Sequence, residues 1–421
     1  MLSSITVLRR ISAPRLCRNI TTVILNDDAL VLPSLKNATF PYIWLRDSCQ
    51  SPECKHPATT QKLHNSTDFD VDIRPKKVVI IDEKSESGPG IHIEWPDGHI
   101  SLFTKEFLER HSSRNDLARF RKDVSAKTWD KEHLQKSPDL FLKHEELQTP
   151  SGLLKVIDQL CKYGLLFFHG VPTTPESSIT DLAHYFSSEI RETFYGRIFH
   201  VQNTNSENIA YTNLKLDLHM DLLYFQHPPR YQILHCIRNN VQGGSSIFSD
   251  SFHSAKLLST EEFSTLSKTP VPYEYLYGQH HLHHSHPVIE LDHDNPTLVY
   301  PPIKFVNYSP PFQAPLLLHP ATPSTPPLRQ SYLALGHFVT LLESPKHTFE
   351  YTLQEGDAVI FDNRRVLHAR TAFTDLKDTS NISEAGKNGK EISRWLQGCY
   401  FEGDSMKDRG RILRTKAGSN H

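Results

Sequence analysis

Hydrophobic and polar positions indicate a small β-rich region in the first quarter of the chain. Short runs rich in β-branched residues, among them residues 77–81 and 91–95, alternate with turn-forming segments such as residues 86–90. These patterns predict strands, and we expect a small domain over residues 23–125. A charged stretch over residues 110–144 shows little periodicity and predicts a connector to the rest of the chain.

The remaining pattern begins with an amphipathic helix and then turns to short strands. Apolar residues recur at helical spacing from residue 151, and the apolar run 165–168 predicts a strand directly after that helix. Short strands such as residues 231–237 then dominate, which favours a jelly-roll barrel with an interior that can hold a buried site. We therefore expect a mainly β protein with helices, whose second domain spans residues 140–421.

Three further helices and one loop are predicted within the second domain. The helices are expected at about residues 176–189, 261–267 and 329–343. The Pro-rich segment 310–327 predicts a surface loop inserted between strands.

Charge and hydropathy exclude several classes of partner. The 421 residues include 46 basic and 48 acidic side chains, for a net charge of −2, and no basic stripe interleaved with aromatic residues is present. We therefore expect no nucleic-acid partner. No apolar run approaches the roughly 18 residues of a membrane-spanning helix, so we expect no membrane partner either.

The first 22 residues have the composition of a mitochondrial transit peptide. No acidic residue occurs before Asp27, and four arginines lie among Leu, Ile, Val and Ser. We expect a mitochondrial matrix protein, and a disordered tail on a cytoplasmic protein is the alternative. Six Cys in a chain of this size do not indicate a disulfide framework, and a reducing compartment fits them.

His219 and Asp221, one residue apart, form a candidate iron site with the distant His368. Side chains alternate along a β-strand, so a strand here would point His219 and Asp221 to the same face. His368 follows the apolar residues 357–361, which predict a strand running into a turn. Two histidines and one carboxylate make the facial triad of non-haem Fe(II), which leaves three positions on the metal for a co-substrate and O2. The chain has 25 His, so a structural role for the pair is the alternative.

A second metal site is predicted in the first domain. Cys49 and Cys54 flank a short loop, and His99 follows a predicted strand and turn. Thiolates from a tight loop and an imidazole from a returning hairpin predict a structural Zn2+ site. A closed tetrahedral site needs a fourth ligand, for which His56 is the nearest candidate and His64 the next. Two free thiols in a small β domain are the alternative.

Several blocks of the sequence resemble the carnitine-biosynthesis oxygenases, γ-butyrobetaine dioxygenase and trimethyllysine dioxygenase. The resemblance runs from about residue 40 to 415, and it is specific because a Cys/His region and the iron triad occur in the same order. It implies a double-stranded β-helix catalytic domain, dependence on Fe(II), 2-oxoglutarate, O2 and ascorbate, a zinc-bearing N-terminal domain and a homodimer. The blocks are residues 44–47, 95–99, 208–212, 219–221, 227–229, 234–237 and 243–244.

The resemblance also implies roles for individual residues. His219, Asp221 and His368 match the iron ligands of the family. Arg394 matches the residue that holds the distal carboxylate of 2-oxoglutarate, a task suited to a planar bidentate guanidinium. The segment between His368 and Arg394 is longer than the family usually shows, because residues 378–390 form an inserted polar stretch.

Four aromatic residues match the substrate cage of these oxygenases. A trimethylammonium group cannot donate N–H hydrogen bonds, so its recognition relies on cation–π contact with aromatic faces. Phe199 departs from the Trp usual at its position, which should weaken the cage without abolishing it. The matching residues are Tyr195, Phe199, Tyr211 and Tyr400.

The choice of substrate depends on the end opposite the cage. Asn208 stands where trimethyllysine dioxygenases tend to place an Asp, and a neutral amide suits the lone carboxylate of γ-butyrobetaine, with Asn307 as a further contact. Residues 227–229 also favour this branch, whereas residues 191–197 and the leader favour the other. We expect hydroxylation of γ-butyrobetaine to L-carnitine, with succinate and CO2 as co-products. The alternatives are 3-hydroxylation of N6,N6,N6-trimethyllysine and, from another class, a non-catalytic binding module.

Overall fold

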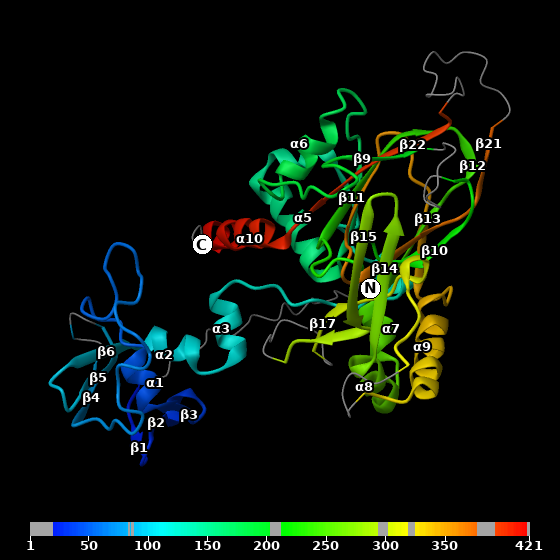
Figure 1. Cartoon of the computed structure of the whole chain (residues 1–421). Coiled ribbons are helices and arrows are strands. Elements are labelled where there is room, and N and C mark those ends of the chain that lie inside the picture. Colours follow the sequence, from blue (N-terminus) through cyan, green and yellow to red (C-terminus); the bar gives the residue numbers. More distant parts are fainter. Residues whose placement is uncertain are drawn as a thin grey trace, which may run out of the picture. The chain divides into compact units, whose positions relative to one another are not determined.

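The protein divides into two compact units, which are considered separately (Figure 1). This computed structural model describes residues 20–418 apart from 83–84, 86–87, 203–211, 294–301, 319–324 and 377–391. The first unit ends at Arg121 and the second begins at Lys122. Residues 1–19 of the expected leader lie outside the part of the chain that the structure describes.

Unit 1 contains two antiparallel three-stranded sheets with short helices between and after them. The first sheet has the order β1 (Ile24–Leu25), β2 (Ala29–Leu32) and β3 (Ala38–Pro41). The second has the order β4 (Lys77–Ile81), β5 (Gly90–Glu94) and β6 (Ile100–Thr104). The helices are η1 (Pro33–Leu35), α1 (Tyr42–Asp47), α2 (Lys105–His111) and α3 (Arg114–Phe120).

The alternation of β5 explains how unit 1 obtains a core. Ile91 and Ile93 are buried on one face of the strand, while His92 between them is partly exposed. The two isoleucines join a cluster that includes Trp95 and Phe103, both fully buried. The predicted small β-rich domain is therefore present as a unit with its own core.

The charged stretch 110–144 is not the simple connector that the sequence pattern predicted. It contains α3 at the end of unit 1, and α4 (Lys131–Gln135) and β7 (Phe141–Lys143) within unit 2. Trp129 is fully buried; its backbone N–H donates to Asp250 at 2.9 Å and its indole N–H to the carbonyl of Tyr163 at 2.7 Å. The single large side chain of Trp129 fixes this segment to unit 2. The sequence pattern did not reveal this, because one buried residue produces no periodicity.

Two sheets form the barrel of unit 2, and only the pairing of β7 with β8 is parallel among their strands. The six-stranded sheet has the order β7, β8 (Leu165–His169), β19 (Ala358–Asp362), β11 (Tyr231–Asn239), β22 (Arg394–Phe401) and β9 (Phe199–Gln202). The four-stranded sheet has the order β10 (Leu216–His219), β20 (Val366–Arg370), β13 (Ser246–Asp250) and β18 (Thr348–Tyr351).

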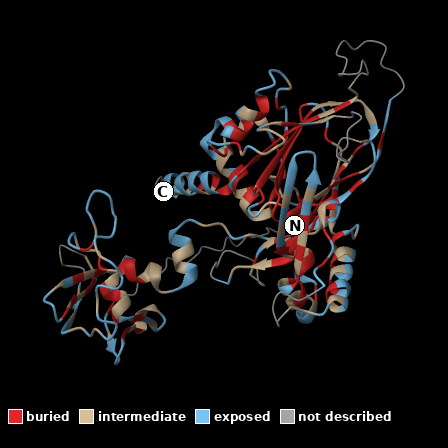
Figure 2. Cartoon of the chain, in the orientation of Figure 1, coloured by how far each residue is buried: buried red, intermediate tan, exposed pale blue. Residues whose placement is uncertain are grey.

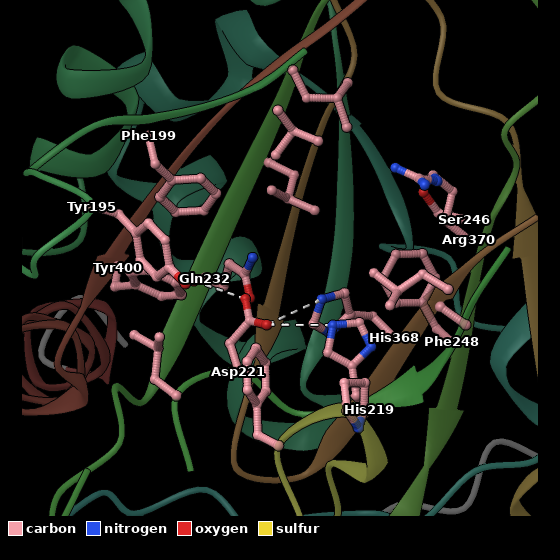
Figure 3. A pocket seen from close by; sticks show the side chains of 18 of the residues that line it. Tyr195, Phe199, His219, Asp221, Gln232, Ser246, Phe248, His368, Arg370 and Tyr400 are labelled. Atoms are coloured by element: carbon pink, nitrogen blue, oxygen red, sulfur yellow. Dashed lines mark hydrogen bonds and ion pairs between the residues drawn. The ribbon is translucent and has the colours of Figure 1, made fainter. Parts of the chain in front are cut away.

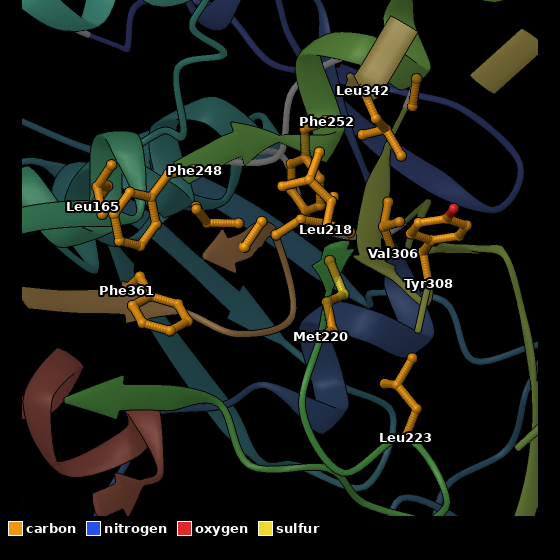
Figure 4. Packing of buried hydrophobic residues seen from close by; sticks show 14 of the residues in the cluster. Leu165, Leu218, Met220, Leu223, Phe248, Phe252, Val306, Tyr308, Leu342 and Phe361 are labelled. Atoms are coloured by element: carbon orange, nitrogen blue, oxygen red, sulfur yellow. The ribbon is translucent and has the colours of Figure 1, made fainter. Parts of the chain in front are cut away.

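The inner faces of the two sheets meet through aromatic side chains (Figure 4). The ring of Phe248 on β13 has its centroid 5.6 Å from that of Phe167 on β8 and 5.6 Å from that of Phe361 on β19. All three are fully buried, and burying each one contributes roughly 2–3 kcal/mol to folding. Two facing sheets around a common interior confirm the predicted double-stranded β-helix, or jelly-roll.

The longer helices of unit 2 carry both buried and exposed residues, as the colours of Figure 2 show. Two of the predicted helices, α8 and α9, match the expected ranges closely, whereas α6 is shorter than predicted. The helical segments of unit 2 after α4 are η2 (His144–Gln148), α5 (Pro150–Tyr163), α6 (Ser178–His184), α7 (Ser251–Lys256), α8 (Thr260–Lys268), η4 (Pro310–Phe312), α9 (Leu328–Leu342) and α10 (Gly403–Gly418).

Helix α5 begins and ends where its sequence specifies. The Thr149 side chain accepts a hydrogen bond from the backbone of Gly152 at 3.0 Å, and Pro150 occupies the first turn. Gly164 ends the helix in the left-handed conformation at φ 71°, which a residue with a Cβ adopts less readily. The next residue, Leu165, starts β8, so the strand is positioned directly by the helix end.

Short hairpins complete unit 2. They are β14 (Pro270–Tyr277) with β15 (His280–Pro287), and β16 (Ile289–Leu291) with β17 (Ile303–Val306). In addition, β12 (Val241–Gly243) pairs with the distant β21 (Phe373–Asp375). Over the described ranges, none of the helices has the length and apolar character required to cross a bilayer.

Candidate active site

The two candidate iron-binding histidines lie opposite one another on neighbouring strands. In the antiparallel pairing of β10 with β20, His219 and His368 are direct cross-strand partners, and their ring centroids lie 4.2 Å apart. Cross-strand neighbours project from the same face of a sheet, so both imidazoles point into the barrel. Register alone therefore brings together two residues that are far apart in the sequence.

Asp221 joins them from a turn rather than from a strand, which corrects the prediction. Strand β10 ends at His219, and Leu222 has a left-handed backbone at φ 62°. The side chain of Asn363 holds this turn, because it accepts from the Asp221 backbone N–H at 2.8 Å and donates to the Asp221 carbonyl at 3.1 Å. The carboxylate of Asp221 still reaches the histidines. Asp221 and His219 face the same site because the hydrogen bonds with Asn363 hold the turn, and not because side chains alternate along a strand.

The three side chains offer their ligand atoms to a common point (Figure 3). Oδ1 of Asp221 lies 3.4 Å from Nε2 of His219 and 3.8 Å from Nε2 of His368, and one ligand atom from each of the three lies within 4.8 Å of the others. Nδ1 of His219 lies 2.8 Å from the carbonyl of Asp217. Since a carbonyl only accepts, Nδ1 carries the proton and the lone pair of Nε2 faces the site.

Protonation states suit a divalent metal. Burial, followed by the neighbouring His219, lowers the pKa of His368 to about 3, so the imidazole is neutral at physiological pH. Burial by itself would raise the pKa of Asp221, but His368, His219 and a hydrogen bond from Tyr400 hold it well below its usual range. Two imidazoles and one ionised carboxylate are the donor set of a non-haem Fe(II) site, so the residues present fit that metal.

A cationic region lies at one end of the pocket. Arg394, the first residue of β22, lines the pocket and is only 4% exposed, and its buried Nε has no hydrogen-bond partner. Arg370 lies on the same face of β20 as His368 and donates to the carbonyls of Thr212 and Leu214, both at 2.7 Å. Burial lowers the pKa of Arg394, and burial with the nearby Arg394 lowers that of Arg370 to about 10.

Both guanidinium groups are charged at neutral pH, because an arginine side chain keeps its proton in proteins. Two buried cations in one pocket favour an anionic occupant, and a guanidinium with a free N–H matches a carboxylate. The position of Arg394 therefore fits the distal carboxylate of 2-oxoglutarate.

Aromatic side chains form the other end of the pocket (Figure 3). Three of the four predicted cage residues, Tyr195, Phe199 and Tyr400, line it. The rings of Phe199 and Tyr400 are stacked with centroids 5.1 Å apart. Phe199 lies directly over Gly398, where a Cβ would come within 2.1 Å of the ring. The glycine thus creates the space that the aromatic wall occupies.

Tyr400 has a second contact that the sequence did not indicate. Its hydroxyl donates to Oδ2 of Asp221 at 2.7 Å, while Oδ1 of the same carboxylate faces the histidines. Burial and the adjacent Asp221 raise the pKa of Tyr400 well above its ordinary value, so the hydroxyl keeps its proton. Tyr400 therefore fixes the rotation of the carboxylate as well as contributing a ring face.

Three other predicted residues have different outcomes. Asn208 and Tyr211 lie outside the described residues. Asn307 was predicted to contact substrate, and this is wrong. The side chain is fully buried, donates to the carbonyl of Pro287 at 2.7 Å and accepts from Arg364 at 2.8 Å, so neither polar atom is available to a ligand.

Several lining residues were missed. Arg370 follows His368 at the period of a strand, a signal that could have identified it. Gln232 and Ser246 gave no comparable signal, because their strands read as ordinary apolar runs. Phe312 lies in the segment predicted to be a surface loop, yet it lines the pocket, and its ring contacts that of Tyr224, another lining residue, at 5.1 Å between centroids.

The candidate zinc site of unit 1 is assembled in part. Nε2 of His99 lies 3.2 Å from Sγ of Cys49 and 3.5 Å from Sγ of Cys54. Burial raises the pKa of the Cys49 thiol, but hydrogen bonds, first from His99, outweigh this and lower it to about 7, which favours the thiolate that binds metal. The prediction of His56 as fourth ligand is wrong, because its ring is exposed and accepts from the backbone of Thr59 at 3.2 Å.

The fallback ligand His64 also lies outside this cluster. Its Nε2 contacts Asp47, at 3.1 Å from the carbonyl and 3.3 Å from the carboxylate. Among the residues described for unit 1, the group that could hold a metal consists of Cys49, Cys54 and His99.

A jelly-roll that carries a two-histidine, one-carboxylate group beside a buried arginine defines the class of Fe(II)- and 2-oxoglutarate-dependent dioxygenases. The chain belongs to this class through the family "Taurine catabolism dioxygenase TauD, TfdA family", whose model matches residues 131–400. A second model, "Gamma-butyrobetaine hydroxylase-like, N-terminal", matches residues 32–113. The chain is thus a dioxygenase of the TauD family with an N-terminal region like that of the γ-butyrobetaine hydroxylases.

Similar proteins support this family membership, but they include enzymes named for different substrates. The chain is 49% identical to "Dioxygenase str8" of Strobilurus tenacellus over 89% of this chain and 85% of that protein. It is 31% identical to the mitochondrial trimethyllysine dioxygenase of Rattus norvegicus, with coverage of 89% and 82%. It is 29% identical to the γ-butyrobetaine dioxygenase of Pseudomonas sp. (strain AK-1), with coverage of 89% and 90%.

Proposed function

We propose that this dioxygenase hydroxylates γ-butyrobetaine to L-carnitine and releases succinate and CO2. The observation that carries the proposal is the aromatic wall of Tyr195, Phe199 and Tyr400 beside Asp221. Ring faces attract a quaternary ammonium group, which offers no hydrogen bond to a polar pocket. Hydroxylation of trimethyllysine is the second candidate, because it presents the same trimethylammonium end.

The polar lining supports γ-butyrobetaine over trimethyllysine. Trimethyllysine carries an α-ammonium in addition to its carboxylate, and a buried ammonium requires an acceptor. Among the described residues that line the pocket, the single carboxylate is Asp221, which is engaged by the histidines and Tyr400. Asn208, a neutral amide, remains our proposed contact for the substrate carboxylate.

Each end of the pocket has a separate task in the proposed reaction. Bound Fe(II) together with 2-oxoglutarate supplies the oxidation of an unreactive C–H bond by O2. His219, Asp221 and His368 would hold the metal, and Arg394 would orient the co-substrate by its distal carboxylate. The aromatic wall would hold the trimethylammonium group and exclude water, so that the carbon to be hydroxylated is held in one position.

Parallel turnover assays test this proposal. We expect succinate formation by the Fe(II)-loaded protein with 2-oxoglutarate and ascorbate to be stimulated strongly by γ-butyrobetaine and weakly by trimethyllysine. The Asp221→Ala variant should retain its fold by circular dichroism and lose turnover with both. Stimulation by neither compound would refute the proposal, and preference for trimethyllysine would replace it with the second candidate.

A substrate analogue that lacks the cationic charge tests the aromatic wall specifically. In 5,5-dimethylhexanoate, carbon replaces the quaternary nitrogen of γ-butyrobetaine without changing the shape. Tyr195→Leu should raise KM for γ-butyrobetaine about tenfold, the equivalent of one lost cation–π contact. Binding of the analogue with the uncharged tert-butyl end should change little, because leucine preserves the apolar surface. Equal effects on both compounds would contradict a cage.

The proposal also covers the oligomeric state of the protein and its location in the cell. We propose a homodimer in the mitochondrial matrix, with ascorbate maintaining the iron as Fe(II) during turnover. The motivation is the composition of residues 1–22 and the resemblance to carnitine-biosynthesis oxygenases. Light scattering of the purified protein and import of the full chain into isolated mitochondria are the measurements that decide these two points, with a cytoplasmic protein as the alternative.

A further inference from the structure

A second cavity of unit 2 is surrounded by basic side chains and shares no lining residue with the dioxygenase pocket. It encloses about 740 Å3 of empty space, part of it open to solvent, and is lined by residues of the contacting helices α5 and α10. Lining residues also come from the segment after unit 1 and from β11, β19 and α7. The polar and charged ones are Asp123, Cys161, Arg230, Tyr231, Asp362, Arg365, Lys407, Arg411 and Arg414.

The C-terminal helix α10 provides one wall of this cavity. Lys407, Arg411 and Arg414 are four and three residues apart, so they lie along one face of the helix. Arg230, the residue directly before β11, also lines the cavity, and its charge acts on Lys407. Its guanidinium is held over the rings of Tyr231 and Phe305, at 5.8 and 4.9 Å from the ring centroids.

The arginines of the cavity are all neutralised by carboxylates. The ion pairs are Arg230 with Asp362, Arg365 with Asp250, Arg411 with Asp123, and Arg414 with Asp158. Lys407 is the exception, since no described carboxylate lies within ion-pair distance of its ammonium. The nearby Cys161 does not compensate, because burial raises the pKa of its thiol and keeps it neutral.

Two donors of the cavity are therefore without acceptors. Lys407 is half-buried, and burial followed by the charge of Arg230 lowers its pKa. Nε of Arg230 is buried and has no hydrogen-bond partner. The charges of Asp362 and Asp404 act on Lys407, but neither carboxylate is in ion-pair contact with it. A partly buried ammonium without such a contact and a buried N–H without an acceptor both reduce stability, and one anion placed between them would satisfy both.

We propose that this cavity binds a small anion that carries a carboxylate or a phosphate group, with Lys407 as its principal contact and Arg230 as its second. The neighbouring arginines add favourable potential, although their own carboxylates occupy them. Bound there, the anion fastens α10 to the barrel, because its contacts come from the helix on one side and from β11 on the other.

Thermal unfolding of the full chain tests the site with two probes, inorganic phosphate and malonate, each titrated at constant ionic strength against chloride. We expect a saturable increase in Tm of roughly 5 °C with at least one probe, since a ligand that binds only the folded state stabilises it. The probe that acts identifies the group recognised, phosphate or carboxylate.

Variants of two lysines on α10 separate this site from other effects. Lys407→Met keeps an apolar stem and removes the charge, so it should fold and lose the increase, whereas Lys407→Arg should retain it. Lys416→Met, on the exposed last turn, is the matched control and should respond as the wild type does. Malonate bound at Arg394 would stabilise every variant equally. No saturable increase in the wild type, or the same increase in Lys407→Met, would overturn the proposal.

Discussion

The side-chain amide of Asn363 is hydrogen-bonded to both peptide groups of Asp221, one accepting and one donating, at 2.8 and 3.1 Å. Asn363 is fully buried and also donates to the carbonyl of Pro229 at 3.2 Å. It belongs to the turn between β19 and β20, five residues before His368. One turn thus positions the carboxylate and the second histidine relative to each other.

Removing that amide should weaken metal binding. Asn363→Ala leaves the buried peptide groups of Asp221 without partners, and we expect about 2 kcal/mol lower stability and about tenfold weaker Fe(II) binding. Anaerobic Fe(II) titration and urea unfolding measure the two effects. Gln159→Ala is the control, because it loses a hydrogen bond to the carbonyl of Leu165, and neither residue lines the pocket. Equal metal affinity in both variants would show that Asn363 has no positioning role.

Gly244 should control binding of 2-oxoglutarate through Arg394. A Cβ at Gly244 would lie 3.2 Å from Nε of Arg394, and the backbone has φ 72°. Gly244→Ala should therefore displace the guanidinium and raise KM for 2-oxoglutarate about tenfold, since a charge-assisted hydrogen bond contributes about 1.5–3 kcal/mol.

A second glycine separates displacement of Arg394 from backbone strain. Gly278 has φ 61° and nothing within 4 Å of its Cβ position. Both Gly→Ala changes place a Cβ on a left-handed backbone, so each should lose roughly 1 kcal/mol of stability. Gly278→Ala should leave KM for 2-oxoglutarate unchanged. An unchanged KM in Gly244→Ala would mean that Arg394 does not hold the co-substrate.

Acid should destabilise the barrel through His235. This residue is fully buried, and burial lowers its pKa to about 4 in the folded protein, against about 6.5 when unfolded. The unfolded chain therefore binds more protons between these values, so stability falls as pH falls. We expect His235 to account for about 2 kcal/mol of lost stability between pH 7.5 and pH 5.

Urea unfolding at several pH values checks the contribution of His235. His235→Leu should lose that share of the pH dependence and retain the remainder, which includes His286, another buried residue with a pKa lowered to about 4. An identical pH profile in wild type and His235→Leu would contradict the assignment.

Unit 1 should bind zinc independently of the iron site. We expect about one zinc per chain by elemental analysis, because two cysteine sulfurs and an imidazole converge there. Cys49→Ser should abolish zinc and lower the melting temperature while leaving Fe(II) binding intact. His56→Asn should change neither, since His56 lies outside the cluster, and loss of zinc in that variant would restore it as a ligand.

Sequence patterns identified residues whose positions depend on regular structure. His219 was placed on a strand, and His368 was expected just after the apolar strand that ends at residue 361, although it lies on the next strand, β20. Arg394 came from the resemblance to the oxygenase family, and it starts β22. Asp221 was found by spacing but for the wrong reason, because no local signal reveals that Asn363 holds it in a turn. Asn307 was misassigned for a similar reason: its amide oxygen accepts from Arg364, 57 residues away, and its amide nitrogen donates to the carbonyl of Pro287.

Strand β22 carries Arg394 near one end and Tyr400 near the other, and both face the pocket. It is paired on both sides, with β11 and with β9, so it cannot stretch or slide. Six residues of extended chain span about 20 Å. The strand therefore fixes the distance between the cationic end of the pocket, at Arg394, and its aromatic end, at Tyr400. Substrates that differ by a single methylene would therefore present different carbons to the metal, and chain length itself becomes a determinant of which position is oxidised.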